Sequence, residues 1–295
     1  MQHVDEQYLD PKTDNCRVCN TLLDTEGWKL QSNPDVSMRE CPACFSVCAD
    51  RLPVDAFLSE LYKPENYTPH LAGDDGLSKR AAKRLLKRIQ PLLQESLSIV
   101  DFGGSDGNFA RLLRKELKED GYGGDISITV VDIFERPMED GIRFLNADAF
   151  AEDQCKYNLI LASAVLEHLR DMGDVVSLLM AKADNDAFFY ARTPYDIPIA
   201  KLGAKNRVVW PRHLYDLGPH FWDNFLTTFG ASGEFLYSGP SVTQTEFSSK
   251  LIETLIATAM KFPSYLELKC IKPIIGYNGY VWKWVGGWEV VIRLN

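Results

Sequence analysis

The chain has 295 residues, 45% of them hydrophobic, and a formal net charge of −9 at pH 7. This length suffices for one large domain, or for one domain with a small annex. Nucleic-acid-binding domains carry a basic footprint, so the acidic balance argues against an extended nucleic-acid partner. Because no apolar run approaches the roughly 20 residues that span a bilayer, and because the start of the chain is polar, a cytoplasmic protein is expected.

Four cysteines near the N-terminus have the spacing of a small zinc site. Cys16 and Cys19 form one CxxC pair, and Cys41 and Cys44 form a second. Each pair lets a tight turn aim two thiolates at one ion, and two such turns make a closed tetrahedral site with no position open for catalysis. We therefore predict a structural Zn²⁺ at these four residues, with cysteines spaced this way by accident, or used in redox exchange, as the alternative.

The segment that follows is expected to connect a small module to a larger domain. Residues 52–62 have the spacing of a short helix, and residues 79–89 have that of a helix with a basic outer face. A stretch rich in glycine and aspartate lies between them at residues 72–76. We predict two domains, a zinc-binding module over residues 1–72 and a larger domain over residues 73–295.

From residue 97 onwards, strand-like segments alternate with helical ones. The strand-like segments are residues 98–102, 126–132, 143–148, 157–163 and 187–192, and the clearest helices are residues 109–120 and 172–182. Strands that alternate with helices predict βαβ units and a parallel sheet, which is the α/β fold class. Ligands bind such sheets beyond the carboxyl ends of the strands, near the point where the strand order reverses.

The turn after the first of these strands suits a nucleotide-like cofactor. It reads Val100-Asp-Phe-Gly-Gly-Ser-Asp-Gly-Asn-Phe109, in which three glycines let the backbone approach a ligand and the following helix offers free amides. Asp132, at the end of the second strand, is placed to accept hydrogen bonds from ribose hydroxyls. The turn is shorter than a dinucleotide fingerprint and contains Asp106, which favours a cofactor with an amino-acid part and a sulfonium over one with a pyrophosphate.

These motifs together form a family resemblance. The sequence resembles the class I S-adenosylmethionine-dependent methyltransferases over residues 95–240, through the glycine-rich turn and then Val-Val-Asp-Ile, Asn-Ala-Asp-Ala-Phe and Leu-Ile-Leu-Ala-Ser-Ala-Val-Leu-Glu-His-Leu. The resemblance implies a Rossmann-like, seven-stranded methyltransferase sheet with S-adenosylmethionine as cofactor. The residues that it implies at the cofactor are Asp101, Gly103, Gly104, Ser105, Asp106, Gly107, Asp132, Ile133, Asp148, Ala149, Ala162 and Ser163.

The same likeness assigns parts of the cofactor to these residues. It implies the methionine part at the three glycines, the ribose at Asp132, the adenine at Asp148 and Ala149, and the sulfonium end at Ala162 and Ser163. Two positions depart from the family pattern. Ser105 replaces the middle glycine of the common GxGxG motif, and Asn158 replaces the usual aspartate before the fourth strand.

A finer resemblance concerns the acceptor. A CxxC pair ahead of Pro53-Val-Asp-Ala-Phe-Leu-Ser-Glu-Leu-Tyr-Lys-Pro-Glu-Asn-Tyr67 looks like the zinc-containing methyltransferases of bacterial sugar and surface-polysaccharide pathways. This likeness implies O- or C-methylation of a sugar, sugar nucleotide or surface glycan. Residues 210–215 stand where that group tends to have a Tyr-His-Glu-His-like segment, and only His213 matches it.

Methyl transfer is an in-line displacement, and a hydroxyl or activated carbon acceptor must also lose a proton. Histidine suits this task, and His213, in the loop after the fifth strand, is the first candidate for the general base. His168, after the fourth strand, is a second candidate beside the acceptor, or a helix-start residue bonded to the backbone. Tyr195 is expected to orient a sugar hydroxyl or to cover the site, with ordinary packing as the alternative.

The C-terminal part is the hardest to interpret from sequence. Residues 235–238 and 288–293 resemble the antiparallel closing hairpin of the methyltransferase fold, with a helical and aromatic insertion near residues 240–284. The alternatives for this insertion are packing on the sheet, a substrate lid, a homodimer contact and a peripheral membrane contact. Two other functions stay open, an RNA methyltransferase that binds its substrate through the zinc ribbon and a non-catalytic cofactor-binding module.

Overall fold

The structure is a computed structural model of the whole chain. The described residues are 3–63, 75–93, 95–133, 137–138, 140–195, 209–241 and 286–295, together with 262, 266 and 270. The expected domain boundary at residue 72 and nearly all of the expected insertion near 240–284 lie outside them, and both stay predictions. Among the described helices, none is long and apolar enough to cross a membrane.

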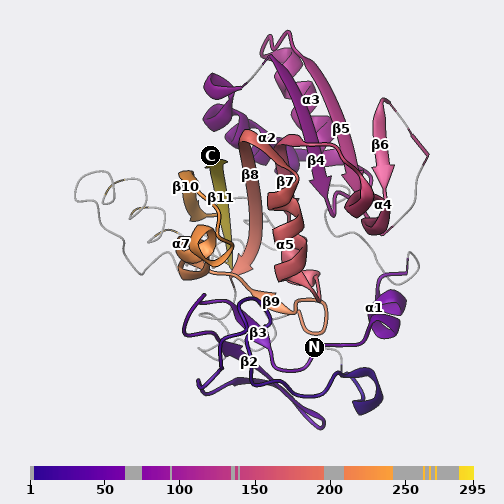
Figure 1. Cartoon of the computed structure of the whole chain (residues 1–295), viewed down its shortest axis with the longest axis vertical. Coiled ribbons are helices and arrows are strands. Elements are labelled where there is room, and N and C mark those ends of the chain that lie inside the picture. Colours follow the sequence, from indigo (N-terminus) through magenta and orange to yellow (C-terminus); the bar gives the residue numbers. More distant parts are fainter. Residues whose placement is uncertain are drawn as a thin grey trace.

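The elements follow the alternation expected from residue 97 onwards (Figure 1). The helices are α1 (Asp55–Leu61), α2 (Asp75–Ile89), α3 (Asn108–Glu119), α4 (Ala147–Glu152), α5 (Met172–Ala181) and α7 (Pro219–Thr228), with the 3₁₀ helices η1 (Glu6–Tyr8), η2 (Gln90–Leu92) and η3 (Leu166–His168). The strands are β1 (Trp28–Ser32), β2 (Asp35–Glu40), β3 (Val47–Ala49), β4 (Ser96–Phe102), β5 (Asp125–Val131), β6 (Ile142–Leu145), β7 (Tyr157–Ser163), β8 (Ala183–Tyr195), β9 (Tyr215–Asp216), β10 (Gly233–Pro240) and β11 (Gly286–Leu294).

The larger sheet has seven strands in the order β10-β11-β8-β7-β4-β5-β6. Strands β6, β5, β4, β7 and β8 run parallel, whereas β11 is antiparallel to both β8 and β10. The expected parallel sheet and closing hairpin are therefore confirmed. The strand order reverses between β4 and β7, which is where an open α/β sheet binds its ligand.

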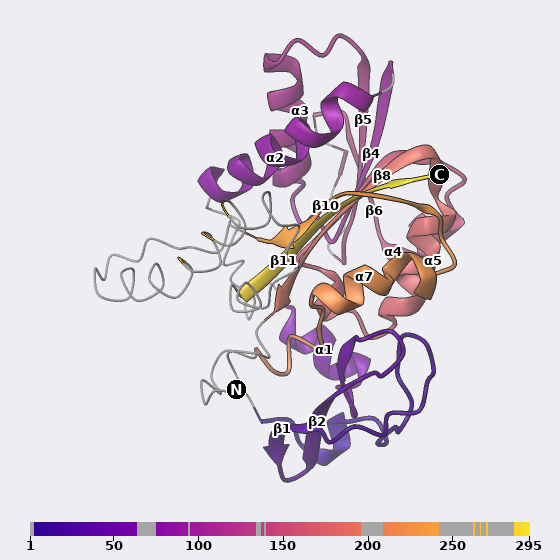
Figure 2. The same cartoon turned by 90° about the vertical axis from the view of Figure 1, so that its left-hand side faces the viewer.

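Helices cover both faces of this sheet. Figure 2 shows α2 and α3 on one face and α4, α5 and α7 on the other. Side chains alternate between the faces along each strand. On β8, Phe188 and Tyr190 pack in one core while Phe189 and Ala191 pack in the other. Because β8 is buried on both sides, its sequence is a nearly continuous apolar run through this stretch.

The third strand-like segment of the sequence is divided between two elements. The strand β6 stops at Leu145, and α4 begins at Ala147, so the predicted strand 143–148 was wrong at its end. Asn146 explains the break, because its side-chain oxygen accepts a hydrogen bond from the amide of Ala149 at 2.8 Å and caps α4. Asp148 consequently lies in the first turn of a helix.

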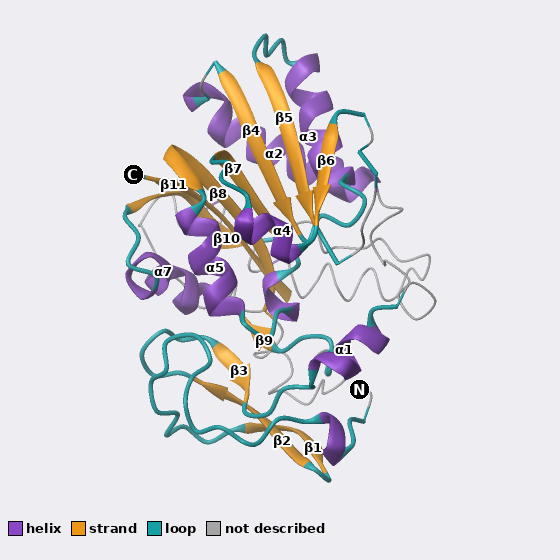
Figure 3. Ribbon diagram, turned by 45° about the vertical axis from the view of Figure 1, so that its right-hand side comes forward, coloured by secondary structure: helices purple, strands orange, loops and turns teal. Residues whose placement is uncertain are grey.

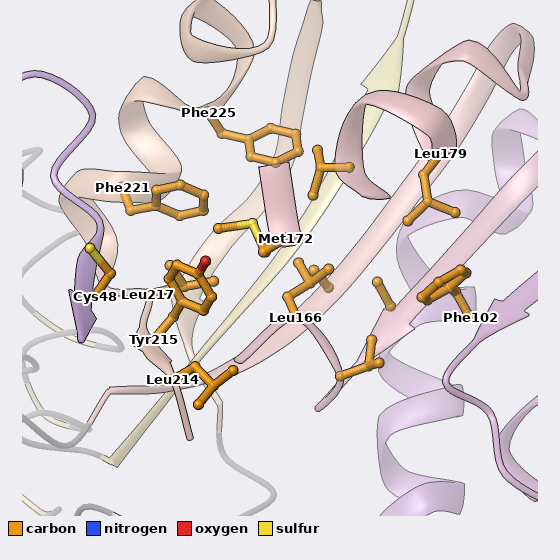
Figure 4. Close-up of a cluster of buried hydrophobic side chains, with 14 of the residues drawn as sticks. Cys48, Phe102, Leu166, Met172, Leu179, Leu214, Tyr215, Leu217, Phe221 and Phe225 are labelled. Atoms are coloured by element: carbon orange, nitrogen blue, oxygen red, sulfur yellow. The ribbon is translucent and has the colours of Figure 1, made fainter. Parts of the chain in front are cut away.

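A second, four-stranded sheet has the order β1-β2-β3-β9. Its last strand comes from the larger domain, with Val47 opposite Asp216 and Cys48 opposite Tyr215. Figure 3 shows β9 between the two sheets, and Figure 4 shows Cys48 of the N-terminal segment beside Phe221 in one buried cluster. The N-terminal segment thus shares both a sheet and a core with the larger domain, at the carboxyl edge of its parallel strands.

Candidate active site

The glycine-rich turn lies at the reversal point of the large sheet. The amide of Gly103 donates to the carbonyl of Val131 at 2.7 Å, which fixes the turn against the end of β5. Gly103 and Gly107 have φ of +70° and +78°. These left-handed conformations favour glycine, and they bend the chain sharply from β4 into α3.

The turn also holds the acid that was predicted to bind the ribose. The amide of Ser105 donates to Oδ2 of Asp132 at 2.8 Å. Ser105 has φ of +53°, so the residue that replaces the usual glycine adopts a conformation typical of glycine. The loop and Asp132 therefore form one unit, with the carboxylate oriented by the backbone.

Asp101 lies beneath this loop, and its side chain is packed tightly. It is 2% exposed, and a Cβ added to Gly104 would lie 2.5 Å from its Cγ. Within the described part of the chain, Oδ2 of Asp101 is buried without a hydrogen-bond donor. Burial, together with the nearby charges of Asp132 and Asp106, raises the pKa of Asp101 to about 7.

These features fit S-adenosylmethionine. A Cβ at Gly103 would collide with Val165 and one at Gly104 with Asp101, so the turn packs only with glycine at both positions. An acidic group below the turn suits a cofactor with a cationic amino-acid end. The other predicted contacts lie around the same edge. Asp148 and Ile133 are exposed, Asp106, Asp132, Ala149 and Ser163 are partly buried, and Ala162 is fully buried.

The four predicted metal ligands converge in the N-terminal segment. The Sγ atoms of Cys16 and Cys44 are 3.6 Å apart, and those of Cys19 and Cys41 are 3.5 Å apart. A tetrahedron with zinc–sulfur bonds of about 2.3 Å has edges of about 3.8 Å, so this cluster fits Zn²⁺. All four thiols are free, and each offers one ligand atom within 4.8 Å of the others.

A second polar cluster lies after β7, at the carboxyl edge of the parallel strands. Glu167 and His168 are in η3, and the loop before β9 brings His213 to them. The rings of His168 and His213 meet edge to face, with centroids 4.9 Å apart and planes at 71°. Nε2 of His168 lies 3.8 Å from Oε1 of Glu167, which is 2% exposed. The structure thus brings together the two histidines that the sequence proposed as catalytic.

His168 is held from its other side. Its Nδ1 lies 3.0 Å from the carbonyl oxygen of Arg212 and 2.9 Å from the hydroxyl of Tyr62. Burial lowers the pKa of His168 to about 4, and burial together with the neighbouring His168 and Arg212 lowers the pKa of His213 to about 3. Both imidazoles are therefore neutral near pH 7.

The cofactor loop and this cluster are in contact. A Cβ added to Gly103 would lie 2.3 Å from Cγ2 of Val165, and the amide of His168 donates to the carbonyl of Val165 at 2.9 Å. One face of the loop consequently packs against the turn that carries Glu167 and His168. The glycine turn therefore lies next to the segment that carries Glu167 and His168.

Tyr195, the third predicted catalytic residue, has a different neighbourhood. Its ring packs edge to face on Trp288, with centroids 6.4 Å apart, and it lies so close to Gly218 that an added Cβ would be 2.2 Å from Cε2 of Tyr195. These contacts are those of a packed ring, which was the alternative at this position. A catalytic role for Tyr195 stays a prediction.

Two members of the cluster had no assigned role in the sequence. Glu167 stood inside the quoted Leu-Glu-His motif, so its place next to His168 was visible there. Tyr62 is 106 residues from His168 in the chain, and no local pattern connects the two.

Comparisons with known proteins agree with this architecture. A family model described as a methyltransferase domain matches residues 76–226. A curated relative, the ubiquinone biosynthesis O-methyltransferase of Methylobacterium nodulans, is 27% identical over 165 residues, which are 53% of this chain and 64% of the relative. The chain thus matches less than two thirds of that relative's length.

Solved structures with a similar chain course have low sequence identity. The plantazolicin methyltransferase BamL, in complex with a triazolic desmethylPZN analog and SAH, has a TM-score of 0.47 and 12% identity, covering 81% of this chain and 90% of its own. Coclaurine N-methyltransferase, bound to N-methylheliamine and SAH, has a TM-score of 0.42 and 14% identity, covering 81% of this chain and 79% of its own.

Proposed function

The chain belongs to the methyltransferase-domain family, and on this premise we propose that it methylates a sugar, a sugar nucleotide or a surface glycan. We propose S-adenosylmethionine as the methyl donor, as the family and the glycine turn imply. The acceptor is the proposed part, with a hydroxyl oxygen, or a carbon next to a carbonyl, as the atom that receives the methyl group.

The observation that carries the proposal is the packing of the cofactor loop against the segment that carries Glu167 and His168. We call Glu167, His168 and His213 together the acceptor wall. Gly103 packs on Val165, and Glu167 and His168 follow directly in η3. An acceptor held by carboxylate and imidazole groups at this place lies next to the expected sulfonium end of the cofactor. Such polar groups suit a hydroxylated acceptor, because each can hydrogen-bond a hydroxyl.

When bound, S-adenosylmethionine supplies an electrophilic methyl group. The residues of the glycine turn then orient it, with Asp132 at the ribose and Asp101 below the amino-acid end. A hydroxyl acceptor forms its bond to the methyl carbon as the carbon–sulfur bond breaks, and the hydroxyl proton leaves toward the acceptor wall. His213 is the first candidate to receive that proton, with His168 behind it. Most of the rate enhancement is expected from holding the two reacting atoms in line.

The cysteine cluster has a structural part in this proposal. Backbone hydrogen bonds run from Ala49 to Leu214 at 3.1 Å and from Leu214 to Glu167 at 2.7 Å. They connect the strand after the second CxxC pair to the loop that carries His213 and then to η3. Zn²⁺ at the cysteines would hold this wall in place without touching the acceptor.

Formation of S-adenosylhomocysteine tests the proposed acceptor class. The zinc-loaded chain is incubated with S-adenosylmethionine and, in separate reactions, with nucleotide sugars, free sugars, phenols and RNA. The proposal expects turnover with at least one sugar compound, and loss of that turnover in His213→Ala. Turnover with phenols or RNA but with no sugar compound would refute the sugar assignment.

A further inference from the structure

We propose that Glu167, His168 and His213 form a second metal centre, which holds a divalent transition-metal cation next to the acceptor. It is separate from the cysteine cluster in both place and chemistry. The occupancy of this centre can be measured without cofactor or acceptor, whereas its part in methyl transfer rests on the proposed function.

The first support is convergence. Each of the three residues offers one ligand atom, and these atoms all lie within 4.8 Å of one another. The imidazole planes of His168 and His213 stand at 71°, so the rings approach a common point from different directions instead of stacking. Three side chains around one point are the arrangement that a bound cation needs.

The hydrogen bonds of His168 supply the second support. A carbonyl oxygen only accepts, so the 3.0 Å contact between Nδ1 and the carbonyl of Arg212 is a hydrogen bond in the tautomer that carries its proton on Nδ1. The hydroxyl of Tyr62, at 2.9 Å from Nδ1, can also accept. In this tautomer Nε2 carries a lone pair, and it lies 3.8 Å from a carboxylate oxygen of Glu167. Metal-bound histidines commonly donate their other ring N–H to a backbone carbonyl in this way.

The third support is that the cluster is held rigidly and remains accessible. The amide of Leu214, next to His213, donates to the carbonyl of Glu167 at 2.7 Å, which joins the two segments that supply the ligands. The side chain of Glu167 is 2% exposed and that of His168 is 23% exposed. The carboxylate of Glu167 is therefore shielded from water, while part of the His168 side chain stays accessible to a ligand.

Two imidazole nitrogens and one carboxylate oxygen select a particular class of ion. This donor set suits Zn²⁺, Fe²⁺, Mn²⁺ or Co²⁺, and three protein ligands leave positions free for water or substrate oxygens. Neighbouring hydroxyls of a sugar would fill such positions. A hydroxyl on the cation loses its proton more easily, and that proton would pass to solvent water, because His213 would then act as a ligand instead of the base.

Titration of the full chain with Co²⁺ tests the centre, with zinc already present at the cysteines. One equivalent of Co²⁺ is expected to bind without the charge-transfer absorption that thiolate ligands give, and with zinc retained. His213→Ala and Glu167→Gln should each weaken Co²⁺ binding at least about tenfold. Loss of a residue that only hydrogen-bonds a metal ligand already lowers metal affinity by about tenfold or more, and loss of a ligand itself should cost no less. His220→Ala is the matched control, because His220 is exposed at the start of α7, and it should bind Co²⁺ like the unmodified chain.

Thermal melting and S-adenosylmethionine binding of each variant show whether it is folded. The metal centre is refuted if the zinc-containing chain binds no Co²⁺, or if folded His213→Ala and Glu167→Gln bind it as tightly as the unmodified chain. Failure to methylate sugars, with Co²⁺ binding intact, would count against the acceptor assignment alone.

Discussion

The hydroxyl of Tyr62 lies 2.9 Å from Nδ1 of His168, across 106 residues of sequence. Tyr62 caps α1, in the N-terminal segment, whereas His168 ends η3 in the methyltransferase domain. The N-terminal segment therefore contributes a polar atom next to His168, which is one of the proposed catalytic residues.

Tyr62→Phe is expected to lower kcat about five- to tenfold, because one hydrogen bond of about 1 kcal/mol no longer orients His168. The affinity for S-adenosylmethionine should stay unchanged, since the cofactor loop is untouched. Steady-state kinetics and calorimetry measure the two effects. Tyr8→Phe is the control, because Tyr8 lies in the same segment and packs on Phe57. Equal kcat in Tyr62→Phe and Tyr8→Phe would show that the Tyr62 hydroxyl has no role.

A side chain at Gly103 should disturb both the glycine-rich turn and the segment at Val165 on which the turn packs. Gly103→Ala forces a Cβ to 2.3 Å from Val165 in a backbone with φ of +70°. The matched control is Gly121→Ala, where φ is +86° and nothing lies within 4 Å. The control isolates the backbone strain, about 1 kcal/mol. Gly103→Ala should lower the free energy of unfolding by at least about 2 kcal/mol more, from overpacking, and weaken cofactor binding.

The additional change Val165→Ala should restore part of the stability lost in Gly103→Ala. Urea denaturation of the single and double variants measures this. If Gly103→Ala and Gly121→Ala cost the same, the contact between the loop and η3 is not tight.

The architecture of the sheet was predictable from sequence, because buried parallel strands are apolar runs of distinctive length and the glycine turn after β4 has few alternatives. The path of the chain between the two sheets could not be predicted from the sequence. The strand β9 is two residues long and pairs with β3 only through tertiary contact, so no periodicity marks it. Tyr62 likewise reached the site through folding of distant segments. The break before α4 was visible in principle, since Asn146 is a common N-cap residue.

Asp101 should make stability depend on pH. Its pKa is about 7 in the folded chain, against 3.8 as an ordinary value. Because the folded state holds a proton that the unfolded state releases, the free energy of unfolding should fall as pH rises from about 4 to 7 and level off above that. The full effect is on the order of 4 kcal/mol. Asp101→Asn should remove this slope in urea denaturation, whereas the exposed Asp24→Asn should keep it. If the free energy of unfolding of Asp101→Asn still falls between about pH 4 and 7, groups other than Asp101 cause the pH dependence.

Loss of the Zn²⁺ proposed at the cysteines should loosen the loop that carries His213. Cys41→Ser is expected to lower the melting temperature by about 5 °C, which corresponds to roughly 3 kcal/mol in a chain of this size. Hydrogen exchange should rise at residues 209–216, because β9 and Leu214 depend on β3. Cys155→Ser is the control, since Cys155 is exposed and outside the cluster. If hydrogen exchange at residues 209–216 is unchanged in Cys41→Ser, the metal at the cysteines does not stabilise the loop that carries His213.

The most direct test of sugar methylation is a competition experiment followed by mass spectrometry. Nucleotide sugars, phenols and RNA are mixed in equal amounts with the zinc-loaded chain and isotopically labelled S-adenosylmethionine. The proposed function predicts that the label appears first in a nucleotide sugar, on one hydroxyl or carbon, and that His213→Ala abolishes this product. Label that accumulates in the phenols or in RNA, with none in any sugar, would contradict it.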